Sequence, residues 1–133
     1  MFHGKVAVVV DDSASIRREV KAILEKQGMT VRIAGSEFGM FNSIEEYGKK
    51  ADLIIMDLNL NNEHGFDLIS KLKNTSRYND INVLVLTQYA DLDNVKQAKN
   101  LGVEAYLRKP IDAKELSTKI KSIFEKQVQS KEN

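Results

Sequence analysis

Residues 6–12 read Val-Ala-Val-Val-Val-Asp-Asp. Five consecutive apolar residues, four of them β-branched, are typical of a strand that is buried on both faces of a parallel sheet. Two carboxylates follow this strand directly. In an open α/β sheet, ligands bind outside the carboxyl ends of the strands. The stretch therefore predicts a fold class and the edge of the sheet at which a site should lie.

Three further apolar runs end in polar residues in the same way. Residues 53–56 are followed by Asp57, residues 83–86 by Thr87, and residues 105–108 by Lys109 and Pro110. Residues 30–34 alternate and predict a partly exposed strand. Each of these five segments is followed by a helical pattern. Strict alternation predicts an α/β fold with a doubly wound, five-stranded parallel sheet and helices on both faces.

Two helices in this pattern carry expectations about their extent. Phe38, Phe41, Ile44 and Tyr47 predict the apolar face of the second helix, which should end near Gly48. In the last helix, the apolar positions stop at Phe124, and a polar tail from residue 127 to residue 133 is expected to fray. The predicted domain therefore covers residues 1–126.

A five-stranded fold of this kind fits the flavodoxin-like strand order 2-1-3-4-5, whose switch point lies between the first and third strands. That order brings Asp11 and Asp12 beside Asp57. Two carboxylates about 4 Å apart repel by about 4 kcal/mol at an effective dielectric near 20. A hard divalent cation relieves this repulsion, and Mg²⁺ suits a site of few carboxylates that also accepts phosphate. With the ammonium of Lys109 and the hydroxyl of Thr87, Asp57 is equipped to attack a phosphoryl group.

Composition excludes several classes of function. The chain has 133 residues, with 20 Lys and Arg against 19 Asp and Glu, so its net charge is only +1. A nucleic-acid-binding module usually carries a clear basic excess. The chain has no cysteine, and its apolar runs are too short for a signal peptide or a membrane span. We expect a single cytoplasmic domain that binds neither nucleic acid nor membrane.

These motifs together resemble the receiver domain of two-component response regulators, in its single-domain, chemotaxis-regulator-like form. The resemblance covers residues 5–126 and rests on five matches in order: VVVDDS at 8–13, DLIIMDL at 52–58, Gly65, Leu86 with Thr87, and GVEAYLRKP at 102–110. Each match is weak alone, but their order and spacing are specific.

The resemblance implies roles for individual residues. Asp57 would accept a phosphoryl group from the phosphohistidine of a histidine kinase or histidine phosphotransfer protein. Mg²⁺ would be held by Asp11, Asp12, Asp57 and the backbone carbonyl of Asn59. Thr87 and Lys109 would contact the phosphoryl oxygens, and Thr87 with Tyr106 would form the switch. The family also implies a cis peptide bond between Lys109 and Pro110, and output through a target protein that binds the face of the fourth helix, fifth strand and fifth helix.

Two positions depart from the family pattern. Gln88 follows Thr87 where a small residue is usual, and Asn61 stands where the loop after Asp57 commonly carries a proline. Both bear on access to the phosphorylated state and on its lifetime.

Other interpretations remain open for single residues and for the function. Asp12 and Ser13 are also good helix caps, and Tyr106 could be ordinary core packing. An aspartyl-phosphate phosphatase would need a second acid/base carboxylate two residues after the nucleophile, where this chain has Asn59. The chain is therefore not expected to be an enzyme beyond catalysing its own phosphorylation and dephosphorylation. The alternative is a degenerate receiver that binds a partner independently of phosphorylation. A stand-alone receiver that signals by altered protein binding is the leading hypothesis.

Overall fold

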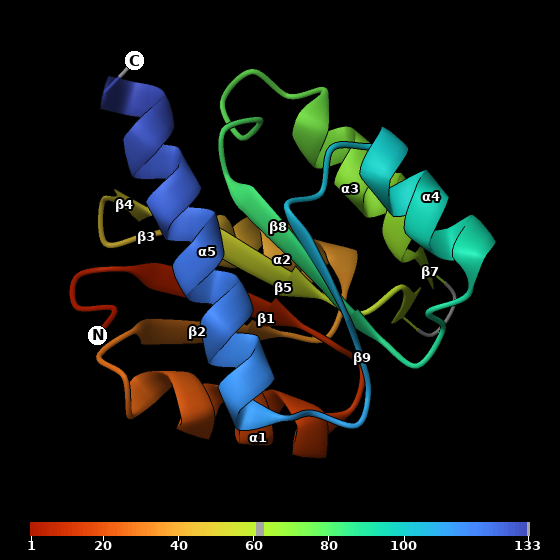
Figure 1. The fold of residues 1–133 in the computed structure, drawn as a ribbon, viewed down its shortest axis with the longest axis horizontal. Coiled ribbons are helices and arrows are strands. Elements are labelled where there is room, and N and C mark those ends of the chain that lie inside the picture. The colour runs from red at the N-terminus through yellow and green to blue at the C-terminus, as the bar shows by residue number, and fades with distance from the viewer. Residues whose placement is uncertain (61–62, 133) are drawn as a thin grey trace.

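The computed structural model describes residues 1–60 and 63–132, and the departure predicted at Asn61 lies outside them. A central sheet has the order β2-β1-β5-β8-β9, and all four of its strand pairs are parallel. Along the chain, β1, β2, β5, β8 and β9 are the first to the fifth strands of this sheet. The predicted strand order 2-1-3-4-5 is therefore confirmed (Figure 1). The sheet strands are β1 (Val6–Val10), β2 (Thr30–Ala34), β5 (Leu53–Met56), β8 (Asn82–Thr87) and β9 (Ala105–Arg108).

Helices cover both faces of this sheet (Figure 1). On β1 the alternate residues Ala7 and Val9 pack with α1 and α5, while Val6, Val8 and Val10 pack with α2 and α3. A strand whose two faces are both covered must be apolar at every position, which explains the continuous run at residues 6–10. The helices are α1 (Ala14–Glu25), α2 (Glu37–Ile44), α3 (Gly65–Lys73), α4 (Leu92–Asn100) and α5 (Ala113–Glu132).

The second helix is shorter than predicted. α2 ends at Ile44, and a hairpin of β3 (Glu45–Glu46) and β4 (Lys49–Lys50) follows it. The turn residues Tyr47 and Gly48 both have positive φ, as a tight two-residue hairpin turn requires. Tyr47 therefore lies outside α2 and is exposed, and the expectation that the helix extends to about Gly48 is wrong. Phe38 lies within α2 as expected, although its side chain is exposed.

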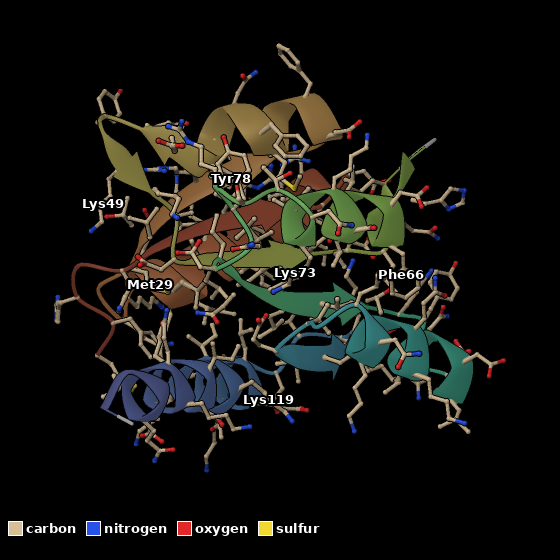
Figure 2. All side chains as sticks on the ribbon, turned by 90° about the horizontal axis from the view of Figure 1, so that it is seen from above. Met29, Lys49, Phe66, Lys73, Tyr78 and Lys119 are labelled. Carbon is tan, nitrogen blue, oxygen red and sulfur yellow. The ribbon has the colours of Figure 1, made fainter. Side chains whose placement is uncertain are left out.

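One side chain accounts for the early end of α2. The Arg32 guanidinium donates to the carbonyls of Ser43 and Ile44 at the end of the helix, and to those of Glu46 and Lys49 in the hairpin. A cation at this end of a helix satisfies carbonyls that have no partner within the helix. Tyr78, from the loop after α3, also lies close to α2 (Figure 2), with its ring centroid 6.2 Å from that of Phe41.

The last helix is longer than predicted. α5 continues to Glu132, so residues 127–132, expected as a fraying tail, are helical. Extending an existing helix costs far less than starting one, and Gln, Lys and Glu have high helix propensity. The apolar pattern that ends at Phe124 marks the end of core contact and not the end of the helix.

Candidate functional site

Three carboxylates meet where β1 and β5 end at the same edge of the sheet. Asp11 and Asp12 follow β1, Asp57 follows β5, and the Asp57 amide donates to the Val10 carbonyl at 3.0 Å. One carboxylate oxygen from each residue lies within 4.8 Å of the others. Asp11 and Asp57 are buried, whereas Asp12 is exposed. The structure thus brings together the three acidic residues that the sequence placed at the switch point.

Lys109 joins this cluster from the end of β9. Its Nζ donates to Asp11 Oδ2 at 2.8 Å and to Asp57 Oδ2 at 3.2 Å. Its backbone amide donates to the Thr87 carbonyl at 2.8 Å, and the expected cis peptide bond to Pro110 is present. Burial lowers the pKa of Lys109, but its bonds to Asp11 and Asp57 and their charges outweigh burial, and the net pKa is raised. The lysine is therefore a fixed positive charge between two buried carboxylates.

The two carboxylates that share Lys109 differ in their remaining partners. Burial raises the pKa of Asp11 above its ordinary value of 3.8, although Lys109 and the Ser13 amide partly offset the effect. The Ser13 amide donates to Asp11 Oδ1 at 2.9 Å, and the Asn59 amide donates to Asp57 Oδ1 at 3.3 Å. Asp57 thus has both carboxylate oxygens bonded, one to the Asn59 amide and one to Lys109, and it lines the pocket together with Asn59.

Gly65 sets the course of the chain after Asp57. A Cβ atom at this position would lie 2.7 Å from Leu58 Cα and 2.8 Å from the Asp57 carbonyl oxygen. The glycine lets α3 begin directly against the backbone of the site, with its amide donating to the Leu58 carbonyl at 2.9 Å. Between Leu58 and Gly65, the short segments β6 (Asn59–Leu60) and β7 (Glu63–His64) pair as antiparallel strands, where the sequence predicted only a loop.

A pocket of about 260 Å³ contains the site. Gln88 is among the residues that line it, so the unusual residue after Thr87 does border the site. The residues that line the pocket are Asp11, Asp12, Ser13, Asp57, Asn59, Gln88, Tyr89 and Lys109. Of these, Tyr89 was missed by sequence reasoning, because an aromatic residue in a loop has no pattern that marks it.

Tyr89 also connects the two predicted switch residues. Its amide donates to the hydroxyl oxygen of Thr87 at 3.3 Å, and its carbonyl accepts the hydroxyl of Tyr106. Thr87 is fully buried and Tyr106 is partly buried. Burial, with the charges of Asp91 and Asp57, raises the pKa of Tyr106 to about 12, so its hydroxyl is a donor at neutral pH. Thr87, Tyr89 and Tyr106 therefore form one hydrogen-bonded chain that leaves the pocket toward β9.

The donor set fits a hard divalent cation. Carboxylate and carbonyl oxygens are the ligands that Mg²⁺ prefers, and it retains several waters when protein ligands are few. Asp12 lines the pocket and is exposed, so the pocket is open to solvent on this side, where such waters and a phosphate would lie. Among the described residues, Asp11 and Asp57 both form their ion pair with the same ammonium, that of Lys109, so a further cation among the three carboxylates is favoured electrostatically.

Comparison with known proteins assigns the chain to one class. Residues 7–121 match the model of the response regulator receiver domain, and the chain belongs to this family. Chemotaxis protein CheY of Pseudomonas aeruginosa is 30% identical over 119 residues, which cover 90% of this chain and 95% of that protein. A CheY-like receiver domain protein from Methanospirillum hungatei superposes with a TM-score of 0.84 at 29% identity, covering 95% of this chain and 98% of that chain.

Relatives of other kinds share the same domain. The phosphate regulon transcriptional regulatory protein PhoB of Pseudomonas aeruginosa is 31% identical over 121 residues, which cover 91% of this chain but 52% of that protein. This chain thus spans about half the length of PhoB. Sporulation initiation phosphotransferase F of Bacillus subtilis is 24% identical, covering 91% of this chain and 94% of that protein. Across the described residues, no helix combines the length and apolar character that a membrane span needs.

Proposed function

We propose that Asp57 accepts a phosphoryl group from the phosphohistidine of a histidine kinase or histidine phosphotransfer protein, and that the phosphorylated domain signals by altered binding to a target protein. The observation that carries this proposal is the placement of Asp57, bonded to Lys109 and within 4.8 Å of two further carboxylates. Receiver domains are signalling proteins of two-component systems and not enzymes in the usual sense. We further propose that this reaction takes place in the cytoplasm.

The residues of the site divide the work of phosphoryl transfer. An Asp57 carboxylate oxygen bonds to phosphorus while the bond between phosphorus and the donor's imidazole nitrogen breaks, and the imidazole leaves with the electron pair. The transferred group carries its charge on three oxygens, so positioning and charge neutralisation dominate the barrier. Lys109 supplies a positive charge beside the attacking carboxylate. Thr87 is buried and is not among the residues that line the pocket, so it would supply its hydroxyl after moving toward the phosphoryl group. Asp11, Asp12, Asp57 and the Asn59 carbonyl would hold Mg²⁺, which supplies further neutralisation when bound.

The switch follows from the chain of hydrogen bonds through Tyr89. A phosphoryl group on Asp57 offers strong acceptors that the Thr87 hydroxyl reaches only by moving. That movement disturbs the bond from the Tyr89 amide, and with it the contact between Tyr89 and Tyr106. The face formed by α4, β9 and α5 then changes shape and gains affinity for its target. A differential affinity of a few kcal/mol between the two states is enough for such coupling.

Mass spectrometry after treatment with a small phosphodonor and Mg²⁺ tests the acceptor chemistry. We expect one added phosphoryl group that is lost in base and in hydroxylamine, as an acyl phosphate is. Asp57→Asn should abolish it, because the amide is not a nucleophile. Asp93→Asn, at an exposed carboxylate of α4, is the matched control and should be phosphorylated normally. Modification that persists in Asp57→Asn would refute the assignment, and a protein that is never modified would be a degenerate receiver.

A further inference from the structure

Asp11 and Asp12 are consecutive residues whose side chains line the same pocket. In a regular strand, consecutive side chains point to opposite faces of the sheet. The backbone must therefore leave strand geometry between them, and β1 does end at Val10. The Asp11 amide still donates to the Ala34 carbonyl at 3.1 Å, as a continuing strand would. The Asp11 carbonyl turns to a different donor.

That donor is Arg17. Its Nη1 donates to the Asp11 carbonyl oxygen at 2.6 Å from the second turn of α1. The carbonyl of Asp11 and the amide of Asp12 belong to one planar peptide unit. A donor that fixes the carbonyl thus also fixes the direction in which the chain leaves toward Asp12. The other polar groups of Asp11 are bonded to Ala34, Ser13 and Lys109, so Arg17 completes the set.

Gly35 provides the space in which this guanidinium lies. A Cβ atom at Gly35 would be 3.1 Å from Arg17 Nη1 and 3.9 Å from the Asp11 carbonyl oxygen. The backbone of Gly35 does not have positive φ, so conformation does not require a glycine here. The absent side chain leaves room between the end of β2 and the loop after β1, and the guanidinium fills that room.

We infer that Arg17 is a positioning residue that holds the Asp11–Asp12 peptide so that both carboxylates reach one Mg²⁺ ion. The inference rests on the proposed function, because it concerns the same metal site. The positive charge of Arg17 acts in the opposite direction, since any cation near the site repels Mg²⁺. Loss of positioning weakens Mg²⁺ binding, whereas loss of charge alone strengthens it. The sign of the change therefore separates the two roles.

Titration of the unphosphorylated protein with Mg²⁺, followed through the amide signals of Ser13 and Asn59, tests this inference without any turnover. Arg17→Gln is expected to bind Mg²⁺ roughly tenfold more weakly, as loss of a residue that orients a metal ligand usually does. Arg18→Gln removes the same charge from an exposed neighbour on α1 and should bind as tightly as wild type or slightly more tightly. An Arg17→Gln protein that binds Mg²⁺ as tightly as wild type would overturn the inference.

A second variant covers the case in which Arg17→Gln does not fold. Gly35→Val keeps the charge of Arg17 and fills the space in which its guanidinium lies, since even a Cβ atom there would be 3.1 Å from Nη1, so it should weaken Mg²⁺ binding several-fold. Unchanged binding in that variant would also overturn the inference. Suppose that the wild-type protein binds Mg²⁺ and is phosphorylated on Asp57 while the variants bind Mg²⁺ equally well. That result would refute the role of Arg17 and would leave the proposed function standing. Wild-type protein that does not bind Mg²⁺ would refute both.

Discussion

Replacing Lys109 with methionine is expected to destabilise the metal-free protein at neutral pH. The methionine keeps an apolar stem and removes the ammonium that forms an ion pair with both Asp11 and Asp57. Their carboxylate oxygens lie within 4.8 Å of each other. At that upper limit two unit charges repel by about 3.5 kcal/mol at an effective dielectric of about 20, and a shorter separation gives more. Removing one partner of a buried ion pair costs roughly 3–5 kcal/mol. The side chains of Lys109, Asp11 and Asp57 are 17%, 3% and 8% exposed, so solvent screens them little.

Urea unfolding with a chelator present measures this effect. We expect the free energy of unfolding to fall by about 3 kcal/mol, a large part of the 5–15 kcal/mol typical of such a domain. Saturating Mg²⁺ should restore much of the loss, because the ion replaces the missing charge. Lys96→Met, at an exposed position on α4, is the control and should change the free energy of unfolding by no more than about 0.5 kcal/mol.

The loss should also depend on pH in a defined direction. Because the folded-state pKa of Asp11 is raised, its contribution to stability is present below the ordinary value of 3.8 and is lost as pH rises through the raised pKa. Removing Lys109 takes away groups that lower this pKa. The destabilisation caused by Lys109→Met should therefore be greatest at about pH 7 and smaller at about pH 5. A Lys109→Met protein as stable as wild type at neutral pH without Mg²⁺ would refute the electrostatic argument.

Three other perturbations probe separate parts of the site. Mg²⁺ should raise the thermal midpoint of wild-type protein through binding linkage, and Asp12→Ala should abolish this response; an equal shift in both proteins would exclude Asp12 as a ligand. Gly65→Ala should lower the free energy of unfolding by roughly 1–3 kcal/mol, because its Cβ would meet backbone at 2.7 Å, and a neutral result in urea would contradict that close approach. Gln88→Ala should speed either phosphorylation by small donors or hydrolysis of the phosphorylated protein, since Gln88 lines the pocket; unchanged rates in both assays would show that its side chain limits neither.

The sequence by itself determined the sheet and the edge that carries the site. Continuous apolar runs such as residues 6–10 mark strands buried on both faces, and the alternation of strands with helices leaves few topologies. Once the strand order is known, Asp11, Asp12 and Asp57 must be neighbours, because parallel strands end at a common edge. The cis bond between Lys109 and Pro110 was implied only by the family resemblance that the order of the motifs carries.

The tertiary structure alone decided the features that depend on contacts between distant residues. Nothing local marks Arg32 as the side chain that ends α2, since its partners lie 11 to 17 residues away. Tyr47 continues the helical pattern of α2, yet it occupies a turn with positive φ because the hairpin folds back there. Tyr89 contacts Thr87 and Tyr106 through its own backbone amide and carbonyl, and Arg17 donates to the backbone carbonyl of Asp11. Because main-chain atoms make these contacts, the side chains of Tyr89 and Asp11 give no sign of them in the sequence. Periodicity and residue type report burial and chemistry, but main-chain contacts of this kind become visible only when the backbone is placed in space.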